Sequence, residues 1–196
     1  MSRVGKQPVI IPSGVKVSVQ SGVVLIEGPK GKLSFTPAKE IGVTVADGKI
    51  VVAPIVSAGE NGEKIAKTPT KGEIIPTDVK AKYGTARATI NNMVLGVTKP
   101  WKRVLELNGV GFTAKIQGQK LTLAVGFSHD VVVDVPLEVK CTVTKNQIEL
   151  ESVDRQLVGT LAANIRKVQP PEPYLGKGIK YLEEKVRRKA GKTGKK

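Results

Sequence analysis

Residues with binding chemistry concentrate in the stretch PPEPYLGKGIKY, residues 170–181. Prolines precede Gly176-Lys177-Gly178, and Tyr174 and Tyr181 stand on either side of these glycines. Glycines let backbone amides approach a phosphate or ribose closely, and the lysine adds a positive charge. The tyrosines can stack on exposed bases or pack against a sheet. The stretch therefore favours a backbone contact to a polyanion.

Basic residues surround this stretch and continue to the end of the chain. The whole sequence has 32 Lys and Arg against 17 Asp and Glu, a formal net charge of +15. Residues 161–196 hold eleven Lys or Arg and three Glu, a net charge of +8. This asymmetry predicts polyanion binding, with a solvated charged face as the alternative. If about six cations neutralise phosphates, log affinity should fall with log salt at a slope of about −4 to −5. The candidates are Lys177, Lys180, Lys185, Arg187, Arg188, Lys189, Lys192, Lys195 and Lys196.

No catalytic or phosphate-binding motif in the sequence has the residue spacing that its chemistry requires. Ser128, His129 and Asp130 are consecutive, and adjacent strand residues point to opposite faces, so a polar hairpin turn is favoured over a relay. Gly191-Lys192-Thr193 lacks the glycine that a phosphate loop needs five residues earlier, where Val186 stands. Metal-ligand spacing is absent, and Cys141 is the single cysteine, in an alternating pattern typical of a core residue. We therefore predict no enzyme activity, no metal and no cofactor.

The first half of the chain alternates between apolar and polar residues and then changes to a helical period. Asp47-Gly48 suits a type I′ turn between strands at 43–46 and 49–53. In the following helix one face carries Ala86, Ile90, Met93 and Val97. We expect Thr77 or Asp78 to cap this helix and Gly96 to end it.

The second half repeats this order of elements. Short strands, with a turn at Asn146, precede a helix whose apolar face has Leu157, Leu161, Ile165 and Val168. Asp154 can cap this helix, and Pro170-Pro171 end it.

The two predicted helices also have identical residues at corresponding positions. Gly84-Thr85 corresponds to Gly159-Thr160, and Ile90 to Ile165, at an offset of 75 residues. The predicted fold class is α+β, with duplicated small domains that each have an antiparallel sheet and one packed helix.

The predicted boundaries follow this duplication. They are an N-terminal unit at 1–99, a C-terminal unit at 100–174 and a basic tail at 175–196. Residues 55–77 form an insertion in the first unit, a surface loop or a second contact site. The run YLEEKVRRK at 181–189 predicts a helix that either lies along RNA or packs on the domain. No run of 18 apolar residues occurs, and the N-terminus lacks a signal-peptide pattern, so we expect a cytosolic protein without membrane partners.

Several segments in order resemble the family of the sixth protein of the large ribosomal subunit, in its bacterial form. They are MSRVGKQPV with IPSGV, GTARATINNMVLGVTK, LNGVGFTAKIQG with KLTLAVGFSHDV, and QPPEPYLGKGIKY. The resemblance implies two similar α+β domains, direct binding to 23S-type rRNA, and a place near the stalk base and the factor-binding region. It also implies neighbouring large-subunit proteins as partners and a cytoplasmic location in the ribosome. The RNA contacts that it adds are Arg3, Lys6, Pro173, Tyr174, Gly176, Gly178 and Tyr181.

Two departures from the family pattern stand out. Residues 55–77 are longer than the family pattern, and Gln169-Pro170 stands where an Arg pair is expected, so no basic contact is assigned at Pro170. An adaptor that binds acidic proteins through the tail is the alternative function, and co-migration with the large subunit in a sucrose gradient would separate the two. An enzyme is the most distant alternative.

Overall fold

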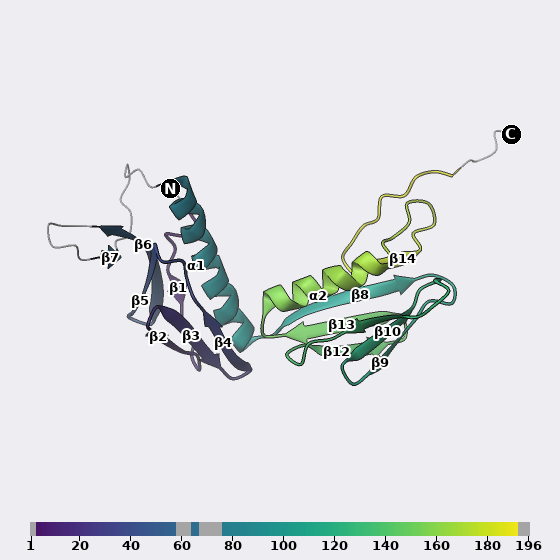
Figure 1. The fold of residues 1–196 in the computed structure, drawn as a ribbon, viewed down its shortest axis with the longest axis horizontal. Helices are drawn as coiled ribbons and strands as arrows, with labels where there is room; N and C mark the ends of the chain where they lie inside the picture. The colour runs from purple at the N-terminus through teal and green to yellow at the C-terminus, as the bar shows by residue number, and fades with distance from the viewer. Residues whose placement is uncertain (1–2, 58–63, 67–75, 192–196) are drawn as a thin grey trace. The chain divides into compact units, whose positions relative to one another are not determined.

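The computed structural model describes residues 3–57, 64–66 and 76–191 (Figure 1). The chain forms two compact units, Met1–Pro100 and Trp101–Lys196. The boundary lies one residue after the one expected from the sequence repeat.

Unit 1 has two antiparallel sheets and one helix. In the first sheet β1 (Val9–Ile10), β6 (Lys49–Ser57) and β5 (Ile41–Ala46) are neighbours, and β7 (Lys64–Ala66) also pairs with β6. The second sheet has the order β2 (Lys16–Gln20), β3 (Val23–Gly28) and β4 (Gly31–Phe35). Helix α1 (Thr77–Thr98) packs against strands of both sheets. The predicted turn at Asp47-Gly48 is confirmed, because both residues have positive φ, 49° and 70°.

Helix α1 buries the predicted face and differs at both ends. Ala86, Ile90, Met93 and Val97 are all buried. The prediction that Gly96 ends the helix is wrong. The last turn packs under the β3–β4 hairpin, where the Lys30 amide donates to the Val97 carbonyl at 3.1 Å, and this contact holds the helix beyond Gly96. The cap prediction is wrong as well, because the N-cap residue is Pro76, which makes no side-chain cap hydrogen bond.

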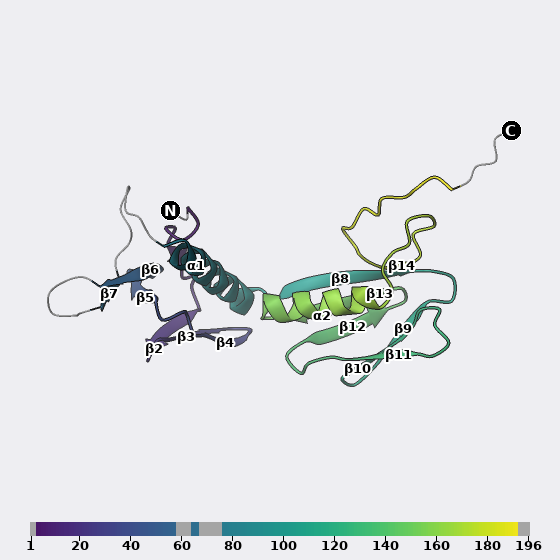
Figure 2. The same cartoon turned by 45° about the horizontal axis from the view of Figure 1, so that its top comes forward.

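Unit 2 repeats this plan, again with a four-stranded and a three-stranded sheet among the described residues. One sheet has the order β12 (Lys140–Thr144), β13 (Gln147–Ser152), β8 (Trp101–Asn108) and β14 (Gly178–Tyr181). The other has the order β11 (Val131–Asp134), β10 (Lys120–Ala124) and β9 (Thr113–Gln117). Helix α2 (Arg155–Val168) lies along β8 in both views (Figures 1 and 2) and also contacts β13 and β14.

The α+β class with one helix per duplicated unit is confirmed, although each unit has two sheets where one was expected. In unit 2 the chain changes sheets at residues 109–112, between β8 and β9. Gly111 has φ +79°, and a Cβ on Gly109 would lie 2.8 Å from the Phe112 ring. A run that alternates like one strand is therefore broken where Gly109 packs against Phe112 and Gly111 adopts a positive φ.

Helix α2 follows the sequence prediction at both ends. The Gln156 amide donates to Asp154 Oδ1 at 2.8 Å, so the predicted cap is confirmed. The helix stops at Val168, before the two prolines. Ile165 is fully buried, as is its counterpart Ile90 in α1.

Two other predicted segments have a different outcome. Residues 181–189 are not helical, so the prediction of a C-terminal helix is wrong: Tyr181 ends β14, and the Leu182 amide donates to the Val104 carbonyl at 3.1 Å. In the predicted insertion, residues 55–57 end β6 and residues 64–66 form β7. Pro76 and Thr77, at the end of that insertion, begin helix α1, and residues 58–63 and 67–75 lie outside the described residues. Among the residues that the structure describes, no helix has the length and apolar character needed to span a membrane.

Candidate nucleic-acid interface

The loop after α2 is closed by its own backbone. The Glu172 amide donates to the Lys177 carbonyl at 2.7 Å, and the Gly176 amide donates to the Glu172 carbonyl at 3.1 Å. Between these bonds residues 173–175 form an exposed turn, in which the Tyr174 side chain is 52% exposed. Lys177 is exposed beside it. An aromatic ring and a cation therefore stand at the tip of a loop whose shape is fixed from within.

The two glycines of this loop are buried and pack against their own chain. Gly178 has φ +137°, and a Cβ there would lie 2.6 Å from the Pro170 carbonyl oxygen and 2.7 Å from Pro171 Cα. The Ile179 amide donates to the Gln169 carbonyl at 2.7 Å. Gly178 is thus required where β14 crosses the chain that leaves α2, a role that sequence spacing did not indicate.

Strand β14 attaches the loop to the sheet of unit 2. It pairs antiparallel with β8 from Gly178 opposite Asn108 to Tyr181 opposite Leu105. Ile179 is completely buried. Lys180 is one of the predicted phosphate contacts, and its Nζ lies 3.0 Å from Glu106 Oε2 on the neighbouring strand. The segment is therefore part of the folded unit, and one of its cations already has a carboxylate partner.

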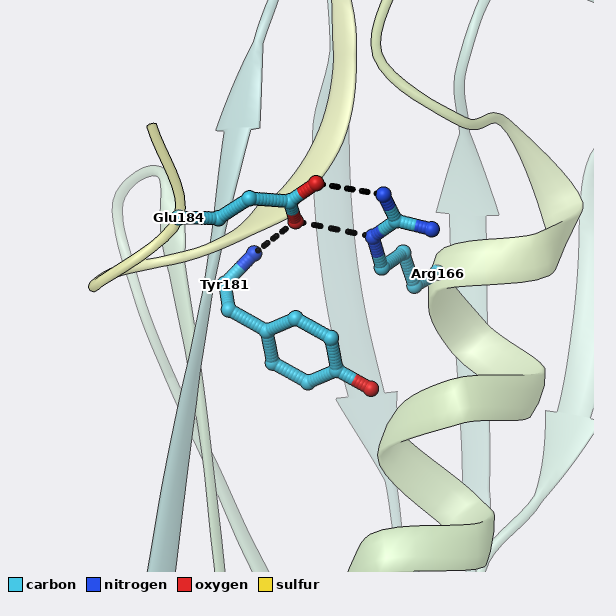
Figure 3. Close-up of polar contacts among 3 residues, drawn as sticks. All are labelled: Arg166, Tyr181 and Glu184. Atoms are coloured by element: carbon cyan, nitrogen blue, oxygen red, sulfur yellow. Dashed lines mark hydrogen bonds and ion pairs between the residues drawn. The ribbon is translucent and has the colours of Figure 1, made fainter. Parts of the chain in front are cut away.

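An ion pair that we name the Arg166–Glu184 clamp holds the chain after β14 on helix α2 (Figure 3). Arg166 Nε donates to Glu184 Oε2 at 2.8 Å, and a second guanidinium nitrogen, Nη2, donates to Oε1. The Tyr181 amide also donates to Glu184 Oε2 at 3.2 Å, and the Arg166 guanidinium lies 5.8 Å from the Tyr181 ring centroid. The hydrogen bond from Arg166 lowers the pKa of Glu184 below its usual 4.5. Both groups are thus charged at neutral pH.

Residues 185–191, which we call the basic segment, run back along the loop. The Lys189 amide donates to the Pro173 carbonyl at 2.8 Å. The Arg188 guanidinium lies over Gly176, where an added Cβ would be 3.0 Å from Arg188 Nη2. The side chains of Lys185, Arg187, Arg188 and Lys189 are exposed, as is that of Lys177 in the loop. These five cations therefore lie on two segments, the loop and the basic segment, that contact each other in the folded unit.

Comparison with known proteins adds an independent line of evidence. The ribosomal protein L6 family model matches residues 11–100 and 108–182, one stretch in each unit. The chain belongs to the ribosomal protein L6 family. A large ribosomal subunit protein uL6 from Opitutus terrae is 45% identical over 194 residues, which cover 98% of this chain and 99% of that protein. A uL6 protein from Oleidesulfovibrio alaskensis is 40% identical over 194 residues, 99% of this chain and 98% of its own length.

This L6-family membership makes the chain a structural ribosomal protein and not an enzyme. Ser128, His129 and Asp130 lie exposed in the connection between β10 and β11. No cluster of His, Cys, Asp or Glu in the described part of the chain has the geometry to hold a metal ion. Cys141 is half-buried, and burial raises the pKa of its thiol to about 11, as expected for an unreactive packing residue.

The remaining predicted contacts lie elsewhere. Arg3 and Lys6 are exposed in the turns before β1, in unit 1. Lys192, Lys195 and Lys196 lie outside the described residues.

Sequence reasoning missed the acidic partners of the basic residues. Glu106 forms an ion pair with Lys180, and Glu184 forms one with Arg166. Neither carboxylate was among the predicted site residues. One signal was available: Glu183 and Glu184 stand together in an otherwise basic run. Acids in such a run indicate an intramolecular partner, because they would weaken a surface that binds only polyanions.

Proposed function

We propose that this protein is a structural constituent of the large ribosomal subunit that binds 23S-type rRNA directly through unit 2. The loop at 172–177 and the basic segment form the contact surface. The observation that carries the proposal is the set of five exposed cations in this loop and in the basic segment: Lys177, Lys185, Arg187, Arg188 and Lys189. Membership of the ribosomal protein L6 family supports an rRNA as the polyanion and the cytoplasmic ribosome as the location.

The chemistry favours recognition of the RNA backbone over a base sequence. Lysine and arginine neutralise phosphates and release counterions, so affinity depends steeply on salt. Tyr174 is more than half exposed at the loop tip and can stack on an unpaired base. The buried residues Gly178 and Ile179 support this surface from below, and the Arg166–Glu184 clamp fixes where the basic segment starts.

By resemblance to the family, the proposed place of contact is near the base of the stalk and the factor-binding region, beside other large-subunit proteins. Arg3, Lys6 and the terminal residues Lys192, Lys195 and Lys196 are proposed as additional contacts. Lys180 has a carboxylate partner in Glu106, so we assign it a smaller share of the binding than the exposed cations.

Substitution of the exposed cations tests the proposal directly. Deletion from residue 175 would remove β14 together with the charges, so side-chain changes are the cleaner test. A variant with Lys177, Lys185, Arg187, Arg188 and Lys189 all changed to Gln should bind a large-subunit rRNA transcript on the order of 100-fold more weakly at physiological salt. The slope of log affinity against log salt should become shallower by about 3 to 5.

The matched control neutralises five exposed lysines of unit 1: Lys16, Lys30, Lys39, Lys49 and Lys80. It changes the net charge by the same amount, so an effect of overall charge alone would appear equally in both variants. The proposal requires the control to retain most of the affinity and of the salt slope. Equal losses in the two variants would contradict it.

A further inference from the structure

A cavity of about 420 Å³ lies in unit 2 beside the clamp, lined by Arg103 of β8, Gly159 of α2, Tyr181, Glu183 and Glu184. Figure 3 shows two of these residues, Tyr181 and Glu184, on the side of α2 toward which the Arg166 side chain extends. A smaller hollow of about 220 Å³ shares Arg103, Tyr181 and Glu183 and extends toward Leu182. The larger volume is in the range of sites that hold a small ligand such as one nucleotide.

Gly159 shows that the space over the helix is open. Glycine in a helix interior costs about 1 kcal/mol relative to alanine, so its presence at such a position needs a reason. An added Cβ at Gly159 would meet no atom within 4 Å, so no packing contact in the described residues requires the glycine. The cavity floor is therefore bare helix backbone, which a flat ligand can approach closely.

The polar groups around the cavity have complementary chemistry. Arg103 is exposed and makes no ion pair with any described residue, so its guanidinium is available to a phosphate. Tyr181 supplies an aromatic wall for a base. The Glu184 carboxylate is engaged by Arg166 and by the Tyr181 amide, whereas Glu183 is exposed. A carboxylate only accepts hydrogen bonds, so Glu183 selects a base whose edge donates them.

We infer that this cavity binds one unstacked guanine nucleotide of large-subunit rRNA, with the base between Gly159 and Tyr181 and a phosphate on Arg103. Guanine presents two neighbouring N–H donors on its Watson–Crick edge, which a carboxylate such as that of Glu183 accepts together. Uracil places a single N–H between two carbonyl oxygens, which the carboxylate repels. This inference rests on the proposed rRNA-binding function and adds base selection to a surface otherwise made for phosphates.

Gly159→Ala separates binding from folding. The new methyl group enters the cavity and touches nothing else, so the helix should keep its stability or gain some. Titration of the ¹⁵N-labelled protein with guanosine 5′-monophosphate should shift the amide signals of Gly159, Tyr181 and Glu183 in the wild type. In Gly159→Ala the affinity for this nucleotide should fall at least 10-fold, and that for an rRNA transcript several-fold.

Two further variants sharpen the test. Gly84→Ala makes the same change at the equivalent position of α1 and should leave nucleotide binding unchanged. Glu183→Gln keeps the size of the side chain and should remove the preference for guanosine over uridine monophosphate.

The outcomes distinguish this inference from the proposed function. Nucleotide shifts confined to the basic segment, or equal affinity of Gly159→Ala and wild type for both ligands, would overturn the guanine site while leaving rRNA binding by the exposed cations intact. A wild-type protein that binds no rRNA transcript would instead overturn the proposed function.

Discussion

Helices α1 and α2 occupy equivalent places in the two units, yet their ends are secured differently. Helix α1 begins after Pro76 without a side-chain cap and has no basic residue in its last turn. Helix α2 is capped by Asp154 and has Arg166 and Lys167 in its last turn. Arg166 is then held by Glu184, beyond the next strand. The duplicated scaffold is the same, and the difference lies in what is attached to the second helix.

The segments that follow the two helices differ as well. After α1 it passes within three residues into β8, whereas after α2 it forms the 172–177 loop, β14 and the basic segment. The fourth strand of the β12-β13-β8-β14 sheet thus lies in the chain between the two parts of the candidate interface, the loop and the basic segment. In unit 2, one continuous segment therefore contributes both a strand of the sheet and the exposed cations of the candidate interface.

The equivalent glycines Gly84 and Gly159 also line cavities of different character. The cavity beside Gly84, about 620 Å³, has small and apolar neighbours such as Val4 and Ala88, with Lys80 as its charged residue. The cavity beside Gly159 is lined by an arginine, a tyrosine and two carboxylates. The equivalent position therefore has mainly polar neighbours in unit 2 and mainly small or apolar ones among the described residues of unit 1.

The largest expected effect on stability is that of Gly178→Ala. A Cβ at this position would collide with the Pro170–Pro171 backbone, which cannot move aside as a flexible side chain can. The positive φ of +137° adds backbone strain. We expect unit 2 to lose on the order of 3 kcal/mol of unfolding free energy. Fluorescence of Trp101, at the start of β8, reports this unfolding in denaturant.

Gly48→Ala is the control in unit 1. Gly48 also has a positive φ, +70°, but an added Cβ would meet nothing within 4 Å. Its cost should be about 1 kcal/mol, from strain alone. If Gly178→Ala cost no more than this control, the crossing at Pro170–Pro171 would not stabilise unit 2.

Glu184→Gln tests the clamp and should have an intermediate effect. The Arg166 and Glu184 side chains are 31% and 24% exposed, so loss of the charged partner should cost about 1–2 kcal/mol at pH 7. Release of the chain after β14 should also speed cleavage by trypsin at Lys185 and Arg187. Equilibrium unfolding and timed proteolysis measure the two effects.

The pH dependence of this effect has a defined sign. The pKa of Glu184 is lowered in the folded state, first by the hydrogen bond from Arg166, from an ordinary value of 4.5. The stabilisation is therefore complete above about pH 4.5 and is lost as the pH falls through the lowered folded pKa. Wild type and Glu184→Gln should therefore converge in stability once the pH falls below the lowered folded-state pKa of Glu184. The corresponding change in unit 1, Glu27→Gln, removes an exposed pair with Lys32 and should have no measurable effect.

Much of the fold follows from local patterns. The apolar faces of both helices, the Asp154 cap and the Asp47-Gly48 turn depend on residues close in sequence, and the structure has all of them. Strand β14 was not predicted, because its four residues pair with β8 about 70 positions earlier and no local signal specifies that partner. Gly96 misled the prediction for a similar reason, since a contact from the β3–β4 hairpin extends α1 past it.

Some residues of the candidate site can likewise be predicted from local sequence, whereas others cannot. Charge and the Gly-Lys-Gly pattern locate the exposed cations without reference to the fold. The partners Glu106 and Glu184, and the cavity over Gly159, depend on elements that are brought together only by folding. Lys180 illustrates the limit: the sequence shows a cation, and only the pairing of β14 with β8 shows that a carboxylate lies opposite.

The smallest effect expected is at the helix N-termini, where Asp154→Ala and Thr77→Ala make parallel changes. Asp154 Oδ1 accepts the Gln156 amide, so its loss should cost unit 2 about 1 kcal/mol. Thr77 follows an N-cap proline and makes no cap bond, so its change should cost unit 1 less than about 0.5 kcal/mol. Trp101 fluorescence follows unit 2, and far-ultraviolet circular dichroism follows both units. Equal costs would mean that the N-termini of the two helices are equally stabilised. The two units would then differ only in the segments that follow their helices.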